Sequence, residues 1–427
     1  MKINTAWLAL AALCAGLFAG TPSVALAQTN VPPPLPATLP PYLQNPAADG
    51  MTVCFLAQGA GEVKVAWHPA EQSKEQTLAA IGTAIPGTPW TMWKARLSGL
   101  KPGDGYGYQV QYRLAGKDER TAHFQFHTLN PQAKAVRFAE VNDIHNHIET
   151  LTAVMRWVKP DDYEFTVLLG DMWTDPSAKD GADKVFRCLA EYIRLCDASQ
   201  KPMLFVRGNH EVRGTFADRM AYLFDLPALD PAAKFGDQNW YYTLKAGPVW
   251  LLALDGGDDF TKRMELFQPI RQRQVDWMRD RLARHDAADA VWRILLTHQP
   301  LYNDDWVTSE PCRLLWEPIL KTAGIDLEIN GHEHCLWKQR ERGKTYEIDF
   351  KEHQPDIVDP QGRKHYSLTP PFPGIIGGGP VLGVDSSGGK MDGVVKLVTA
   401  DEKTLRVRLL AATDGRLLTE FKTEKSR

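Results

Sequence analysis

Eight polar side chains of the sequence have the types that bind metals or transfer protons, and all of them follow apolar runs. They occur in Asp143-Ile144-His145, Gly170-Asp171, Gly208-Asn209-His210, Thr297-His298 and Gly331-His332-Glu333-His334. Runs such as FTVLL and MLFV, which precede two of these groups, are typical of buried strands. The carboxyl ends of strands meet at one crevice in open α/β sheets. We therefore expect these residues to converge in space, although they are spread over nearly 200 positions.

The residue types indicate a site for two metal ions. Carboxylate, imidazole and amide oxygen ligands together suit divalent transition metals, and the set contains no thiolate, which disfavours a closed structural zinc site. Seven candidate ligands are too many for one ion and fit two ions that share a carboxylate. Two metals about 3.5–4 Å apart form a clamp for in-line displacement at phosphorus. The seven candidates are Asp143, His145, Asp171, Asn209, His298, His332 and His334.

The neighbours Asn209 and His210 have different roles in this hypothesis. Asn209 offers an amide oxygen as a neutral ligand. His210 stands where a leaving oxygen departs, and it can protonate that oxygen or stabilise the charge on phosphorus. The expected reaction is hydrolysis of a small phosphomonoester by a metal-bound hydroxide, since bound water loses its proton near neutral pH. Manganese, iron and zinc all suit the ligand set.

The order D-x-H, G-D, G-N-H-E, H, G-H-x-H resembles the calcineurin-like metallophosphoesterase family over about residues 136–340. The resemblance implies a four-layer α/β/β/α sandwich with two central mixed sheets. It also implies two ligand sets, a bridging carboxylate and a catalytic histidine, which Asp143 helps to orient indirectly. These are Asp143, His145 and His334 for the first metal, Asn209, His298 and His332 for the second, Asp171 as the bridge, and His210 as the catalytic histidine.

The elements that must position these residues alternate between strands and helices from about residue 134. This alternation indicates an α/β layered domain. After residue 365 the pattern returns to strands, beginning with GVVKLVTA, and these strands extend the same domain. The helices are expected at 148–158, 182–198, 216–225, 270–287 and 311–323.

The segment before this domain contains short alternating runs with turn residues between them, which predicts an all-β sandwich. Leu100, Pro102 and Tyr106 resemble the tyrosine corner of fibronectin type III domains. A fibronectin-like sandwich followed by a phosphoesterase resembles the purple acid phosphatases. Those enzymes have a tyrosine three residues after the bridging aspartate and no histidine equivalent to His145. Here the third residue is Thr174, so no phenolate-to-iron charge-transfer band is expected.

The chain is expected to divide into four parts: a signal peptide at 1–27, a Pro-rich linker at 28–40, the fibronectin type III-like sandwich at 41–130 and the catalytic domain at 134–427. The leader has an apolar run that ends on Ala25-Leu26-Ala27, which indicates cleavage before Gln28 and a periplasmic or secreted protein. A membrane anchor is the alternative. No membrane span is expected after cleavage. A net charge of −3 gives no reason to expect a nucleic acid partner.

Several alternatives stay open at this level. A histidine at the D-x-H position is common in family members that act on diesters, so a phosphodiesterase for nucleotide or lipid-derived esters is the nearest rival. A non-catalytic surface-binding protein on the same scaffold is a third. Residues that flank the motifs have weaker assignments, either as groups near the substrate or the metals or as ordinary surface or structural groups. These are His147, Asp175, Arg207, Glu211, Arg213 and Glu333.

Overall fold

The computed structural model describes residues 34–334, except 73, 285–286 and 303–306, together with 372–379, 393–426 and the short strands 347–348, 357–358 and 364–365. The predicted signal peptide, residues 28–33 of the Pro-rich linker and Cys335 lie outside the described residues. Within the described part of the chain, no helix combines the length and the apolar character needed to cross a bilayer. Cys54, Cys188, Cys196 and Cys312 are buried, and among the described residues they form no disulfide.

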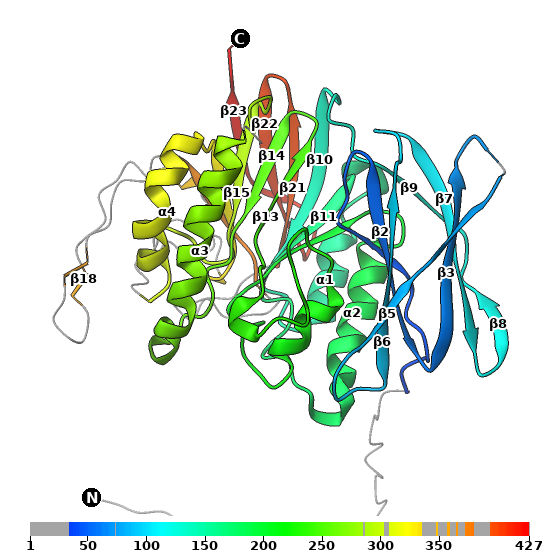
Figure 1. Ribbon diagram of the computed structural model, residues 1–427. Coiled ribbons are helices and arrows are strands. Elements are labelled where there is room, and N and C mark those ends of the chain that lie inside the picture. Colours follow the sequence, from blue (N-terminus) through cyan, green and yellow to red (C-terminus); the bar gives the residue numbers. More distant parts are fainter. Residues whose placement is uncertain are drawn as a thin grey trace, which may run out of the picture. The chain divides into compact units, whose positions relative to one another are not determined.

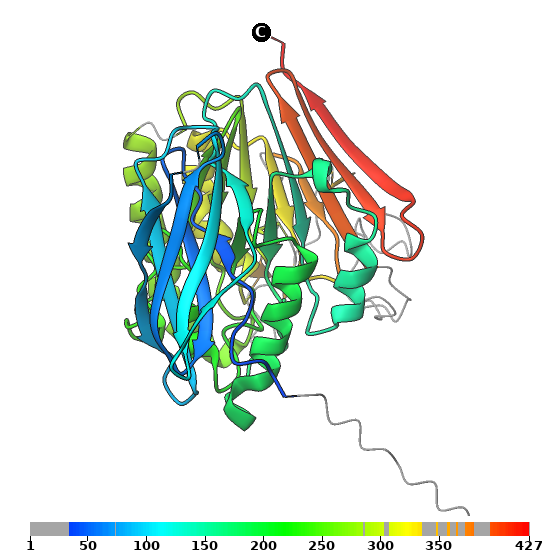
Figure 2. The same cartoon turned by 90° about the vertical axis from the view of Figure 1, so that its right-hand side faces the viewer.

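Residues 42–127 fold into the expected β-sandwich, seen in blue and cyan in Figures 1 and 2. One sheet has the strand order β1-β2-β6-β5, and the other has the order β4-β3-β7-β8 with β9 paired to β7. The hydroxyl of Tyr106 accepts a hydrogen bond from the backbone N–H of Lys101 at 2.7 Å, which is the geometry of a tyrosine corner. The strands are β1 (Tyr42–Gln44), β2 (Gly50–Gln58), β3 (Ala60–Pro69), β4 (Gln76–Ala79), β5 (Ile81–Ala84), β6 (Trp90–Ser98), β7 (Gly105–Leu114), β8 (Lys117–Arg120) and β9 (Phe124–His127).

The α/β region contains two mixed sheets of six strands each, which confirms the expected fold class. Their orders are β12-β11-β10-β21-β22-β23 and β13-β14-β15-β16-β20-β17. In the first sheet β10, β11 and β12 run parallel, and in the second β14, β15, β16 and β20 run parallel. The strands are β10 (Ala135–Val141), β11 (Phe165–Leu169), β12 (Met203–Val206), β13 (Tyr242–Ala246), β14 (Val249–Ala253), β15 (Trp292–Leu296), β16 (Leu327–Asn330), β17 (Glu347–Ile348), β20 (Gly374–Ile376), β21 (Val394–Asp401), β22 (Thr404–Ala411) and β23 (Leu417–Glu424). A separate pair is formed by β18 (Ile357–Val358) and β19 (Lys364–His365).

Helices cover the outer faces of the two stacked sheets, so the region has four layers (Figures 1 and 2). The helices α3 and α4 pack their apolar residues on the second sheet, where Val275 and Trp316 join one core with Trp250 and Leu295. The helices α1 and α2 lie against the first sheet. The α-helices are α1 (Ile148–Met155), α2 (Asp183–Leu195), α3 (Met264–Ala283) and α4 (Ser309–Ala323).

Two of the expected helices differ from the sequence prediction. The segment 216–225 forms a 3-10 run at Ala217–Leu223 instead of an α-helix. The helix expected at 270–287 begins earlier, at Met264, and therefore contains Pro269. Pro269 lies in the second turn of this helix, where it cannot donate an i→i−4 hydrogen bond but does not end the helix.

The sandwich is joined to the α/β region by buried hydrogen bonds. The hydroxyl of Tyr42 donates to the carbonyl of Leu223 at 2.6 Å, and that of Tyr108 donates to the carbonyl of Ser199 at 2.6 Å. The Gln44 amide donates to the carbonyl of Met203 at 2.8 Å. These bonds attach the sandwich to β12 and to the segment that follows the Gly208-Asn209-His210 motif.

Candidate metal centre

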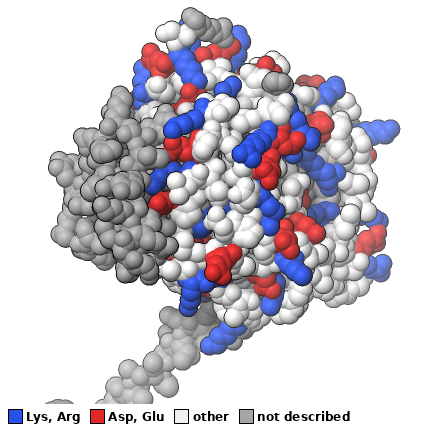
Figure 3. Space-filling model, turned by 60° about the vertical axis from the view of Figure 1, so that its left-hand side comes forward, with Lys and Arg blue, Asp and Glu red and all other residues white. Residues whose placement is uncertain are grey.

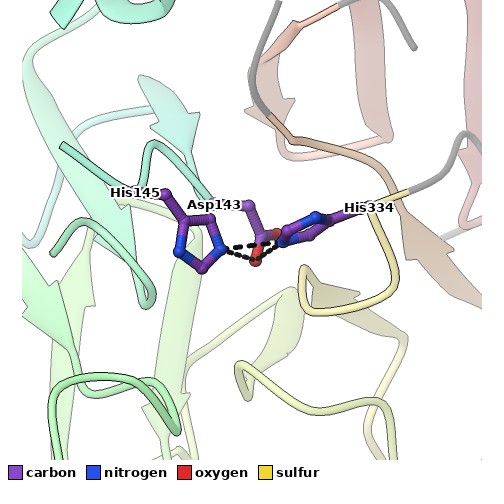
Figure 4. A group of neighbouring side chains, drawn as sticks. All are labelled: Asp143, His145 and His334. Carbon is purple, nitrogen blue, oxygen red and sulfur yellow. Dashed lines mark hydrogen bonds and ion pairs between the residues drawn. The ribbon is translucent and has the colours of Figure 1, made fainter. Parts of the chain in front are cut away.

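The structure brings together all eight side chains singled out by the sequence, at the carboxyl ends of β10, β11, β12, β15 and β16. Three groups of them hold their ligand atoms within 4.8 Å of one another. Figure 4 shows the first group, with the rings of His145 and His334 on either side of the Asp143 carboxylate. The groups are Asp143 with His145 and His334, Asp171 with His145 and His210, and Asp171 with His298 and His332.

The carboxylate of Asp143 has one oxygen that is held by the protein and one that faces the site. Oδ2 accepts hydrogen bonds from Asn142 Nδ2 at 2.5 Å and from the backbone N–H of His332 at 2.8 Å. Oδ1 is buried and has no hydrogen-bond partner among the described residues. It lies 3.4 Å from Nε2 of His334 and 3.8 Å from Nε2 of His145. A buried carboxylate oxygen without a partner destabilises the folded protein unless a cation neutralises it, so the site fits a metal ion.

A second group of acceptor atoms surrounds Asn209. Its Oδ1 lies 2.9 Å from Nδ1 of His332 and 3.1 Å from Nε2 of His298. The opposite amide orientation would place the nitrogen against these rings and give the oxygen a bond from Arg213. A cation among these atoms favours the oxygen-inward orientation, because an amide nitrogen is not a metal ligand.

Asp171 lies between the two groups. Its Oδ2 is 3.1 Å from Nε2 of His298 and 3.6 Å from Nε2 of His145. Its Oδ1 accepts the backbone N–H of His210 at 2.8 Å. One carboxylate oxygen is therefore close to histidines of both sets, as a shared ligand has to be.

Several of these residues have the backbone conformation that favours glycine. Residues other than glycine adopt it at a cost on the order of 1–3 kcal/mol each, and they cluster at functional sites. The turns after β10, β11 and β16 therefore hold their side chains in strained positions. The residues and their φ angles are Asp143 at 53°, His145 at 50°, Asp171 at 52°, His332 at 74° and His334 at 46°.

Glu211 supports the turn that carries Asp171. Its buried carboxylate accepts backbone N–H groups of Gly208, Asp171 and Trp173, each at 2.9 Å. The surface assignment for Glu211 is therefore wrong, and the residue contacts backbone instead of a ligand ring. At Gly208, a Cβ would lie 2.3 Å from Asp171 Oδ1, so this position needs glycine for the close approach of the two turns.

The electrostatics of the site favour a cation between the two carboxylates. Although burial opposes it, Asp171 and Asp143 raise the pKa of His298 to about 10. Its Nδ1–H donates to the carbonyl of Leu169 at 2.8 Å, which turns Nε2 into the site. Burial lowers the pKa of His145 to about 4, so this ring is neutral near pH 7 and able to bind a metal.

His210 lies at the rim of the site and has a carboxylate partner. Its side chain is 24% exposed, and its Nδ1 lies 2.8 Å from Oδ1 of Asp175. Nε2 faces inward, 3.9 Å from Oδ2 of Asp171. From the sequence alone, Asp175 is either a group near the metals or a loop charge, and Asp143 is the residue expected to orient His210 indirectly. The available clue was that Asp175 follows Asp171 by four positions in the same loop.

The two arginines beside the motif differ in their contacts. Arg207 is buried, and its guanidinium binds Asp255, with Nη2 at 2.5 Å from Oδ2. The phosphate-binding alternative for Arg207 is therefore wrong. Arg213 contacts Asp258 and Asp259, and its Nη1 lies 3.3 Å from Nε2 of His210. Arg213 is thus a cation next to Nε2 of His210.

Two further positions bear on the sequence predictions. His147 is half exposed and pairs with Glu149 at 2.9 Å, so it lies away from the metal centre. The hydroxyl of Thr174, three residues after Asp171, lies 3.2 Å from Nδ1 of His145. Thr174 therefore contacts the back of a candidate ligand ring.

Comparisons with known proteins agree with this geometry. Residues 136–336 match the sequence pattern of the calcineurin-like phosphoesterase family. The matched segment lies within the α/β region and contains all eight candidate site residues. Over 60% of its length it is 25% identical to purple acid phosphatase 22 of Arabidopsis thaliana and covers 54% of that protein. It is 24% identical to the phosphoenolpyruvate phosphatase of Allium cepa, over 54% of this chain and 47% of that one.

Solved structures share the fold of the phosphoesterase domain together with the sandwich. The purple acid phosphatase PPD1 from yellow lupin (Lupinus luteus) seeds aligns with 90% of this chain and 74% of its own, with a TM-score of 0.63 and 17% identity. The structure of PhoD aligns over 92% of both chains, with a TM-score of 0.62 and 12% identity. The chain spans about half the length of the curated relatives named above.

Proposed function

We propose that this protein is an exported phosphoesterase with two divalent metal ions that hydrolyses phosphomonoesters. The observation that carries the proposal is the position of Asp171, whose carboxylate approaches histidines of both ligand groups while His210 stands at the rim. The relatives are named as phosphatases, one of them for phosphoenolpyruvate, which supports a small phosphate ester as substrate. The N-terminal apolar leader supports a periplasmic or secreted location.

The proposed ligand sets are the two that the sequence predicts, one for each metal ion. When bound, two divalent ions polarise the phosphoryl oxygens and lower the pKa of a coordinated water. Histidine and carboxylate ligands suit manganese, iron or zinc. Asp143, His145 and His334 would hold one ion, Asn209, His298 and His332 the other, and Asp171 both.

The protein's own contribution to proton transfer lies with His210. Asp175 binds its Nδ1, so Nε2 is the atom that faces the substrate, and it can give a proton to the departing ester oxygen. Arg213 Nη1 lies 3.3 Å from the same nitrogen, and an arginine N–H can only donate. Arg213 would therefore turn from Nε2 to a phosphoryl oxygen before Nε2 gives its proton to the leaving group. These three residues would orient the leaving group relative to the metal centre.

A phosphodiesterase is the second candidate. It is favoured by His145, which the purple enzymes lack and which here lies within the first ligand group. A diester needs the same centre but places a second esterifying group at the rim. Since both reactions use the same residues, activity measurements are needed to distinguish them.

Hydrolysis of p-nitrophenyl phosphate and of bis(p-nitrophenyl) phosphate by the manganese-loaded protein tests both candidates. We expect the monoester to be cleaved faster and a chelator to abolish the activity. Faster cleavage of the diester would instead support the phosphodiesterase. Absence of both activities in the metal-loaded protein would favour a non-catalytic binding protein on this scaffold.

His210→Ala tests the assigned proton transfer. It should lower kcat by about 10²–10⁴-fold while the protein keeps both metals, because His210 is proposed to act on the leaving group and not as a ligand. His147→Ala is the matched control, since His147 is an exposed histidine with its own carboxylate partner, Glu149. Equal effects of the two substitutions would contradict the assignment.

A further inference from the structure

A fully buried lysine lies behind the candidate ligand Asp143. Lys396 on β21 and Glu140 on β10 are direct partners in the register of these antiparallel strands, and neither side chain is exposed. Nζ of Lys396 donates to Glu140 Oε2 at 2.6 Å, to Asn142 Oδ1 at 2.9 Å and to the carbonyl of Gly377 at 2.6 Å. All three donors of the ammonium group are thus used.

Stability alone does not account for this buried ion pair. Removing two charges from water costs several kcal/mol for each ion, so replacing a buried pair by apolar residues of similar volume is often neutral or stabilising. One oxygen of the pair, Oε1 of Glu140, has no hydrogen-bond partner among the described residues. The arrangement therefore calls for another reason to keep Lys396 charged and buried.

The reason lies in the amide of Asn142. An ammonium group can only donate hydrogen bonds, so the amide of Asn142 must turn its oxygen toward Lys396. The nitrogen end is then turned toward Asp143, and Nδ2 donates to Oδ2 at 2.5 Å. Turned the other way, the amide would set an oxygen against the carboxylate and repel it.

The surroundings of Asn142 leave its side chain little freedom. A Cβ added to either Gly331 or Gly378 would lie 2.2 Å from Nδ2 of Asn142, so both backbones pass close to this nitrogen. Figure 1 shows β21, which carries Lys396, beside β10, which leads to Asn142. The amide is thus held by a charge at one end and by close backbone packing at the other.

We infer that Lys396 and Asn142 are positioning residues for the metal ion bound by Asp143, His145 and His334. Their hydrogen bonds hold Oδ2 of Asp143, which leaves Oδ1 as the oxygen that faces His145 and His334. The inference rests on the proposed function, because it concerns one of the two metal positions. It predicts that a residue on β21 controls the affinity of a metal that it does not touch.

The double variant Glu140→Leu/Lys396→Met tests this inference. It replaces the ion pair by apolar side chains and leaves Asn142 Oδ1 without its ammonium donor. Manganese binding to the metal-free protein is followed by titration calorimetry and by metal analysis after dialysis. We expect one of the two ions to bind about 10–100-fold more weakly, the usual effect of losing a group that orients a ligand, and the other to bind as before. Asn142→Leu should weaken the same ion.

Val398→Ala is the matched control on the same strand. Val398 is fully buried and pairs with Phe138, away from Asn142, so its truncation loosens β21 without touching the amide. The inference is overturned if the double variant binds both ions as the parent does, or if Val398→Ala weakens the same ion equally at a similar thermal stability. Failure of the parent protein to bind two ions would refute the proposed function instead, and the inference with it.

Discussion

At the residue scale, Nδ1 of His210 lies 2.8 Å from Oδ1 of Asp175 at the edge of the candidate metal centre. Asp175→Asn keeps the size of this partner but removes its charge, so the ring loses a strong acceptor at Nδ1. We expect kcat for the better ester substrate to fall about tenfold, a modest factor because Asp175 is half exposed and its charge is screened by water.

The matched control for this prediction is Glu149→Gln. It removes the carboxylate partner of His147, which lies at a similar distance from its histidine and is also exposed. Steady-state kinetics of the two variants should show an effect for Asp175→Asn alone. An unchanged kcat in Asp175→Asn would mean that the carboxylate does not orient the catalytic ring.

A second prediction at this scale concerns colour. Thr174 stands three residues after Asp171, where the purple enzymes have their tyrosine, and a threonine hydroxyl cannot supply a phenolate. Protein loaded with iron should therefore lack an intense phenolate-to-iron band in its visible spectrum. Observation of such a band would require another tyrosine to reach the metal.

At the scale of the elements, β16 carries a buried carboxylate next to the strand end that holds the ligands. Glu328 Oε1 accepts hydrogen bonds from Thr297, Leu301 and Asn330, and burial raises its pKa from 4.5 to about 7. The folded protein therefore binds this proton more tightly than the unfolded chain. The resulting stability is complete below pH 4.5 and is lost as the pH rises to about 7.

Glu328→Gln should remove this part of the pH dependence. Relative to the variant, the parent should lose up to about 3 kcal/mol of unfolding free energy between the two pKa values. Urea unfolding of both proteins at pH 5 and pH 8 measures the difference and cancels the contributions of other carboxylates. A constant difference between the two pH values would show that Glu328 is ionised in the folded state at both.

At the scale of the whole molecule, the sandwich and the phosphoesterase domain share buried contacts. Besides the hydrogen bonds of Tyr42, Gln44 and Tyr108, the rings of Trp90 and Phe186 pack with their centroids 5.0 Å apart. On the face shown in Figure 3, basic and acidic side chains are interspersed without a large patch of one sign. At the junction, by contrast, the side chains of Tyr42, Gln44 and Tyr108 are buried.

We expect the mature protein to unfold in a single calorimetric transition, because separating the two parts would expose these buried groups to water. Tyr108→Phe removes one hydrogen bond across the junction and should lower the unfolding free energy by about 1 kcal/mol without splitting the transition. Tyr112→Phe, in the same strand, is the control. Two separate transitions in the parent would indicate that the sandwich unfolds independently.

Much of the candidate site could be predicted from the sequence because the residues next to each candidate ligand show where it lies in the fold. Each ligand candidate follows an apolar strand, and parallel strands place their carboxyl ends at one edge, so Asp143, Asp171 and His298 could be assigned to one site without coordinates. The all-β segment and the alternation of strands and helices follow in the same way from the period of the apolar residues, whereas the two mixed sheets were implied only by the family resemblance.

Only the tertiary structure decided which polar groups support that site. Asp255 pairs with Arg207, Lys396 reaches Asn142 across 254 positions, and Glu211 closes a turn whose residues lie 40 positions away. Such partners carry no periodic pattern, because a charged residue looks alike in a loop, on a surface or in a buried pair. Their roles depend on the burial and direction of side chains, which are fixed only when the two sheets pack together.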